Sequence, residues 1–183
     1  MGATSELAEA PGGPALSLPV DPVHLVLRDF RVLIHAARVH FANTRKTTGL
    51  SGAQVWALSE IERSPGIRLT RLARTLSVHQ TTASNLVNDL LREKLVEKIA
   101  DADDARSINL RTTTEGTALL LRSPFPYAGI LPDALKSLTT LQITALHSAM
   151  RPLLKQLGAE TVERYALTPM SNMLDANAAS TEP

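Results

Sequence analysis

The chain has 183 residues, of which 44% are hydrophobic and only 3% aromatic, so it can form one domain with a sizeable core plus extensions. It contains no cysteine, which excludes disulfides, thiolate metal sites and any sensor that works by thiol oxidation. The formal net charge of +1 is small for a nucleic-acid-binding protein, and without a long apolar run or a secretory leader we expect a cytoplasmic protein.

The N-terminal part is predicted as an arm followed by a long helix. Residues 1–20 are rich in Gly, Pro, Ala and Ser without periodicity, which is typical of a disordered arm. Asp21 and Pro22 then give a helix cap and a proline at the first helical position. An apolar stripe runs from Val26 to Phe41, so this helix needs a surface against which to bury it.

A second helix and a short strand follow. Ser51 and Gln54 have the spacing of a capping box and open a helix to about residue 63. The only tryptophan, Trp56, lies on this helix, where core packing and stacking on a ligand are both open interpretations. The segment 67–69 is predicted as a short strand, with Thr70 capping the next helix.

The segment from Leu72 to Val96 predicts two amphipathic helices joined by a tight turn. Apolar residues recur there at helical spacing with one break at Ser77-Val78. The other face of the second helix carries short donors and acceptors that can read base edges in a major groove, namely Gln80, Thr81, Ser84, Asn85 and Asn88. Thr82 is a further candidate, although it could instead cap the helix or face inward. An ordinary solvated helix face is the alternative, but the turn before this helix and the hairpin after it favour contact with DNA.

A two-stranded wing is predicted next, from residues 95–99 and 107–112. Arg106 lies at its tip, where the guanidinium can enter a minor groove or form a salt bridge with Asp101 or Asp104. Positions 65–112 contain eight basic residues and six acidic ones. The DNA interpretation therefore depends on the pattern of side chains and not on a large positive field.

The C-terminal part is predicted as further helices. Thr112 and Glu115 have capping-box spacing and start a helix that prolines interrupt within residues 123–127. Thr139 and Gln142 open the last long helix in the same way.

The last long helix carries an apolar stripe from Leu146 to Leu157, with Pro152 inside it, so a kink is expected there. Residues 167–183 are predicted as a flexible tail. A monomer of this size offers little surface against which helices at both ends of the chain can bury their apolar faces. A symmetric dimer would bury these faces.

The segment Leu72–Val96 resembles, without a gap, the helix-turn-helix of the multiple antibiotic resistance regulator (MarR) family. The resemblance continues into the wing and the helix after it, where the matching residues are Asp101, Asp104-Ala105-Arg106, Ile108, Thr113 and Gly116. It covers roughly residues 24–158. It implies a mainly α fold with a winged helix-turn-helix over about 51–113, a small antiparallel wing, and long dimerisation helices over about 21–45 and 113–166, all within one domain of residues 21–166.

This chain departs from the family pattern at several positions. Ser77 stands in place of the usual turn glycine, His79 in place of the usual serine cap, and Lys94 in place of a glycine before the wing. Asn85 occupies a recognition-helix position where arginine is frequent, and Ala102, Asp103 and Ala105 occupy wing positions that are often arginine.

The resemblance implies a homodimeric transcriptional regulator that binds a pseudo-palindromic operator in double-stranded DNA, acting as a repressor that a small organic effector releases. A winged-helix dimer that binds protein in place of DNA is the alternative function. The effector pocket is expected between the dimerisation helices and the DNA-binding lobe, and a polar cluster at the dimer interface is the other interpretation of the same residues, which are His35, Arg38, His40, Phe41 and Trp56. Neither a cofactor, a metal site nor enzymatic activity is expected, because the corresponding motifs are absent from the sequence.

Overall fold

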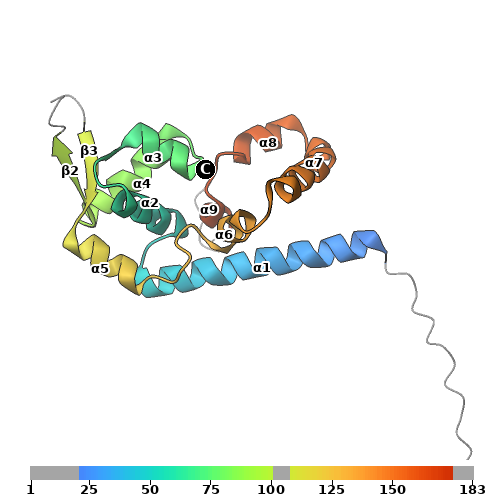
Figure 1. The fold of residues 1–183 in the computed structure, drawn as a ribbon, viewed down its shortest axis with the longest axis horizontal. Coiled ribbons are helices and arrows are strands. Elements are labelled where there is room, and N and C mark those ends of the chain that lie inside the picture. The colour runs from blue at the N-terminus through green and yellow to red at the C-terminus, as the bar shows by residue number, and fades with distance from the viewer. Residues whose placement is uncertain (1–20, 101–107, 175–183) are drawn as a thin grey trace, which may run out of the picture.

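The computed structural model describes residues 21–100 and 108–174 of the chain. The predicted arm of residues 1–20, the wing tip with Arg106 and the end of the predicted tail lie outside these ranges. The described chain is mainly helical with one small three-stranded antiparallel sheet, as the sequence predicted (Figure 1). No helix within the described residues combines the length and apolar character that crossing a membrane requires.

Helix α1 (Pro22–Thr48) is the long rod along one edge of the molecule in Figure 1. The Asp21 side chain accepts a hydrogen bond from the Val23 amide at 2.9 Å, which confirms the predicted cap, and the helix ends at Gly49 in a left-handed conformation. The buried residues of α1 all lie in its second half, so the N-terminal part of its apolar stripe is uncovered in the single chain.

The winged helix is built from α2 (Gly52–Arg63), β1 (Ile67–Arg68), α3 (Leu69–Leu76), α4 (Gln80–Arg92), β2 (Val96–Ala100) and β3 (Ile108–Thr112). The strand order is β1-β3-β2, with Leu110 of β3 opposite Ile67 on one side and Lys98 on the other. Leu58, Ile61, Leu72, Leu90 and Leu110 are its largest fully buried apolar side chains, so α2, α3, α4 and the sheet share one core.

Two predicted helix starts were wrong by one or two residues. Helix α3 begins at Leu69 after Arg68, which pairs with Asn109 in the sheet, so the chain passes directly from strand to helix and Thr70 lies inside the first turn. Helix α5 (Thr114–Arg122) is capped by the Thr113 hydroxyl, which accepts a hydrogen bond from the Gly116 amide at 3.1 Å. Thr112 is unavailable as a cap because it pairs with Val96 across the wing.

Gly116 allows α5 to lie directly against the base of the wing. A β-carbon at this position would overlap the carbonyl oxygen of Leu95 and the side chain of Thr112. The Thr113 amide and hydroxyl also donate to the Leu95 and Lys94 carbonyls, at 3.0 and 2.8 Å. The joint between α5 and the wing is therefore closely packed and hydrogen-bonded.

The remaining helices are α6 (Ile130–Lys136), α7 (Thr140–Gln156), α8 (Ala159–Tyr165) and α9 (Met170–Leu174). The predicted capping box of Thr139 and Gln142 is present, and Pro152 lies inside α7 without ending it. The predicted flexible tail needs a correction at its start. Residues 170–174 form α9, which contacts α1 and α2, because Ser171 finds a buried hydrogen-bond partner there.

Two residues other than glycine have a left-handed backbone conformation within the described part of the chain, and at both positions the sequence comparison expected glycine. Ser77, between α3 and α4, has φ of 53°, and Lys94, between α4 and β2, has φ of 57°. A β-carbon is unfavourable in this region, so each position carries a local energetic cost that glycine would not.

We therefore predict that Ser77→Gly and Lys94→Gly each raise the free energy of unfolding, by about 0.5–1 kcal/mol. Urea denaturation followed by circular dichroism measures this. The control is Glu93→Gly, next to Lys94 but with φ of −77°, which should give no gain. A loss of stability in both test variants would contradict the strain argument.

Candidate functional site

Helix α4 presents a continuous polar face to solvent. Its inner face is buried against α2 and α3 through Ala83, Leu86, Val87 and Leu90. Of the six candidate contacts predicted on α4, Gln80, Thr81, Asn85 and Asn88 are exposed, while Thr82 and Ser84 are half-buried. Thr81, Asn85 and Asn88 follow helical i, i+4, i+7 spacing, so they share one face of the helix.

A polar contact fixes the orientation of α4. The Gln54 side-chain amide donates to the Asp89 carboxylate at 3.1 Å, and Arg92 forms an ion pair with the same carboxylate. The Gln54 carbonyl oxygen accepts from the Ser51 amide at 2.8 Å, so Gln54 is itself held by the capping box of α2. Asp89 was not singled out from the sequence, although its place beside the apolar face of α4 was the available signal.

Exposed basic side chains flank the polar face of α4. Arg71 and Arg74 project from α3, and Lys98 and Arg111 from the two wing strands, all of them exposed. In a helix-turn-helix the first helix crosses the nucleic-acid backbone, where arginines can contact phosphates. Arg71 and Arg74 were not predicted as contacts from the sequence, although their i, i+3 spacing on one helix was an available signal.

The start of α4 also suits an anion. His79 is the N-cap residue, but its side chain makes no capping hydrogen bond. The first amides of this 13-residue helix therefore have no side-chain acceptor from His79, and they are available to a phosphate oxygen.

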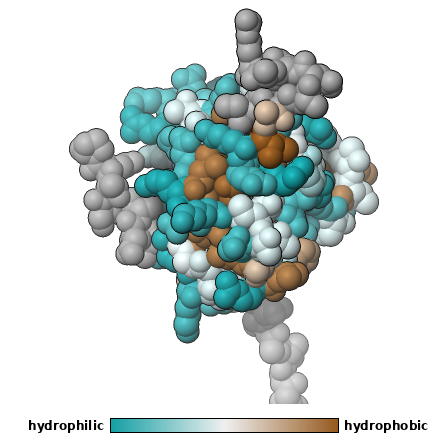
Figure 2. Space-filling view, turned by 90° about the vertical axis from the view of Figure 1, so that its left-hand side faces the viewer, coloured by the Kyte–Doolittle hydropathy of each residue, from teal (hydrophilic) through white to brown (hydrophobic). Residues whose placement is uncertain are grey.

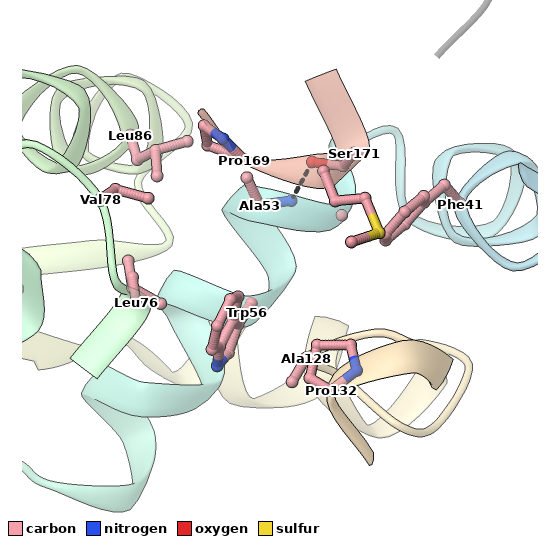
Figure 3. A pocket seen from close by; sticks show the side chains of 12 residues that line it. Phe41, Ala53, Trp56, Leu76, Val78, Leu86, Ala128, Pro132, Pro169 and Ser171 are labelled. Atoms are coloured by element: carbon pink, nitrogen blue, oxygen red, sulfur yellow. Dashed lines mark hydrogen bonds between the residues drawn. The ribbon is translucent and has the colours of Figure 1, made fainter. Parts of the chain in front are cut away.

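The five predicted effector residues are not brought together. Phe41 and Trp56 line a small apolar cavity of about 40 Å³ between α1, α2 and the turn before α4 (Figure 3). His35 and Arg38 are exposed on α1 and do not line it. The assignment of His35 and Arg38 to an effector site stays a prediction.

His40 lies beside the cavity rather than in it. Its ring contacts Phe41 edge to face, with ring centroids 5.7 Å apart. Burial lowers the pKa of His40 from its ordinary value of 6.5, and a hydrogen bond with the backbone of Pro126 partly opposes this.

A larger cleft of about 440 Å³ opens between α2, α5 and the segment before α6. Trp56 separates it from the small cavity and lines both, with its indole N–H donating to Glu60 at 3.2 Å. Leu121 and Phe125 on its rim are 80% and 76% exposed. Hydrophobic residues also reach the surface among hydrophilic ones on the side of the molecule shown in Figure 2. Within residues 21–100 and 108–174, no group of three or more His, Asp or Glu side chains could hold a metal ion.

The comparisons agree with this geometry. Residues 48–107 match the sequence model of the MarR family, while comparison with curated proteins gives no significant match. FabT from Streptococcus pneumoniae, solved in complex with DNA, is 17% identical with a TM-score of 0.52, over 75% of this chain and 97% of its own. Sco3205 from Streptomyces coelicolor, a MarR family transcriptional regulator solved in complex with DNA, is 22% identical with a TM-score of 0.50, over 74% and 87%. The match to the family's sequence model confirms, for residues 48–107, the resemblance to the MarR family that the sequence predicted.

We predict that stability depends on pH through His40. Because its pKa is lowered in the folded chain, the unfolded chain takes up the proton more readily. The stabilising contribution is complete above the ordinary pKa of 6.5 and is lost as the pH falls through the lowered value. The free energy of unfolding should therefore fall below neutral pH, and His40→Gln should reduce that fall.

Denaturation at about pH 7.5 and about pH 5 measures this difference. His35→Gln, an exposed histidine on the same helix, is the matched control. An identical pH dependence in the His40 variant and the wild type would contradict the burial argument.

Proposed function

We propose that the protein is a sequence-specific DNA-binding transcriptional regulator in which α4 enters the major groove. The observation that carries this proposal is the polar face of α4, held outward by a buried apolar face and by the Gln54–Asp89 hydrogen bond. The family of the winged helix, and the DNA complexes of FabT and Sco3205, support the same function.

In this function the side chains divide into two groups. Thr81, Asn85 and Asn88 offer the short donors and acceptors that distinguish base pairs. Arg71, Arg74 and the first amides of α4 offer contacts to phosphates, which fix position without reading sequence. Arg106, which lies outside the described residues, is proposed to reach the minor groove from the wing tip.

We predict that Asn85→Ala changes which base is preferred at one position of the half-site, at a cost of about 1–3 kcal/mol for the native base. Arg106→Ala should weaken binding to all duplexes and lower the salt slope by about one. Selection of binding sites from a random duplex library, followed by salt titration, measures both effects. Asn43→Ala, an exposed asparagine on α1, is the control.

Equal, sequence-blind losses from both variants would overturn this division of roles. Absence of any salt-dependent duplex binding would favour the alternative function, a winged-helix dimer that binds protein.

The protein is further proposed to act as a homodimer through its terminal helices. Val26 and Ile34 on α1 are 53% and 47% exposed, and Leu146 and Leu153 on α7 are 42% and 48% exposed. Large apolar side chains in rows along two helices mark an interface more often than a free surface. A two-fold axis would then place two α4 helices about one turn of DNA apart, so the operator is proposed to be pseudo-palindromic.

We predict that Leu153→Asp converts the dimer to a monomer, because a carboxylate in an apolar interface loses its hydration without gaining a partner. Light scattering at micromolar concentration measures the mass. Lys155→Asp, an exposed position on the same helix, should leave the dimer intact. A monomeric wild-type protein would contradict the architecture.

Regulation is proposed to be repression relieved by a small organic effector. The sequence contains no cysteine, so a thiol cannot be the switch. The small cavity lies between α1 and the winged helix, and the larger cleft lies between α2 and α5, where a bound molecule can alter the spacing of the two α4 helices. Because linkage is reciprocal, such an effector must bind the DNA-bound dimer more weakly than the free dimer.

A further inference from the structure

The C-terminal end of the described chain returns to the centre of the molecule. After α7 and α8, which lie away from the winged helix in Figure 1, residues 167–169 lead back to α9, which contacts α1 and α2. Ser171 on α9 is only 2% exposed, although it is a polar residue near the end of the chain. Buried polar groups are retained where they have a hydrogen-bond partner.

The partner of Ser171 is the first turn of α2. The Ser171 hydroxyl oxygen accepts a hydrogen bond from the Ala53 amide at 3.0 Å, across 118 positions of sequence (Figure 3). Ser51 already caps the Gln54 amide, so Ser171 satisfies a second N–H that would otherwise lack an acceptor. Gln54, the next residue, holds Asp89 of α4, so α9 is tied to the same turn that orients the recognition helix.

The same segment lines the space beside Trp56. Pro169, Met170 and Ser171 form one wall of the small apolar cavity, which Phe41 and Trp56 also line. What remains has a volume of about 40 Å³. An apolar cavity of roughly 150 Å³ is known to accept benzene, so the remaining space is too small for an aromatic molecule while α9 is in place.

The attachment of α9 is weak enough to be reversible. The helix has five residues, too few to be stable by itself, and it has one buried hydrogen bond to the rest of the chain. Met170 and Met173 remain 39% and 48% exposed, so little apolar surface opposes release. Segments with few buried contacts open locally without global unfolding.

We propose that residues 168–174 are a strap that occupies the cavity between α1 and α2, and that an apolar or aromatic ligand binds there only when the strap is released. Release uncovers the cavity and also removes the Ser171 cap from the turn that holds α4. The strap thus competes with a ligand for one site. That this ligand is the regulatory effector rests on the proposed function.

The only tryptophan reports on the strap directly, because Trp56 lines the cavity. We test the full chain against Ser171→Ala, which removes the acceptor for the Ala53 amide, and against a chain ending at residue 167, which removes the strap. Ser148→Ala, an exposed serine on α7, is the matched control. The measurements are acrylamide quenching of Trp56 fluorescence and the affinity for 8-anilinonaphthalene-1-sulfonate, an aromatic probe.

Loss of one net hydrogen bond should shift the balance between seated and released strap by about fivefold. We expect the Ser171 variant to bind the probe about that much more tightly, the truncated chain more tightly still, and Trp56 quenching to rise in the same order. The Ser148 variant should match the wild type. Circular dichroism in each variant separates release of the strap from loss of the fold.

Equal probe affinity and equal quenching in all four proteins would overturn the proposal, as would loss of the winged-helix fold in the truncated chain. DNA binding is measured separately on the same proteins. If the strap results hold but no duplex is bound, the proposed function fails and the strap stands; if a duplex is bound but Trp56 is unaffected, the strap fails alone.

Discussion

The burial of one face of α4 is the interaction on which the rest of the winged helix depends. Ala83, Leu86, Val87 and Leu90 place four apolar side chains in the core shared with α2 and α3, so the opposite face can only point to solvent. Burial of such side chains contributes about 1.5–3 kcal/mol for each large one, far more than an exposed polar contact. The Gln54–Asp89 hydrogen bond then fixes the rotation of the helix within that packing.

The helices at the two ends of the chain bury less of their apolar surface than the winged helix does. The winged helix buries its apolar residues within itself, whereas α1 and α7 leave theirs at the surface. A chain with one completed core and two exposed apolar helix faces is stable as a folded domain. Its exposed apolar faces favour association with another surface. The small cavity lies where Phe41 of α1 meets the winged helix, so a molecule bound there contacts both the winged helix and one of the helices proposed to form the dimer.

The sequence predicted most of the fold because its local signals are strong. The caps at Asp21, Ser51 and Thr139, the break at Ser77 and the wing strands all follow from patterns of a few neighbouring residues. The predictions failed where a residue's hydrogen-bond or strand partner lies far away in the sequence. Thr112 has cap chemistry but is held by strand pairing, and the segment around Ser171 has the composition of a tail but finds a buried partner 118 positions away. The same reason explains the candidate site: the face of α4 is a local property, whereas which residues of α1 line the cavity beside Trp56 depends on tertiary packing.

The close contact at Gly116 has a mechanical consequence. At Gly116 no side chain separates α5 from the Leu95 carbonyl, and Thr113 donates hydrogen bonds to the carbonyls of Leu95 and Lys94. The wing and α5 are therefore expected to move together. Helix α4 is attached instead to α2, through Gln54. Helix α5 is itself joined to α2, because the Thr117 hydroxyl donates to the Glu62 carboxylate at 3.1 Å. A tilt of α5 is therefore transmitted both to the wing and to the helix that holds α4.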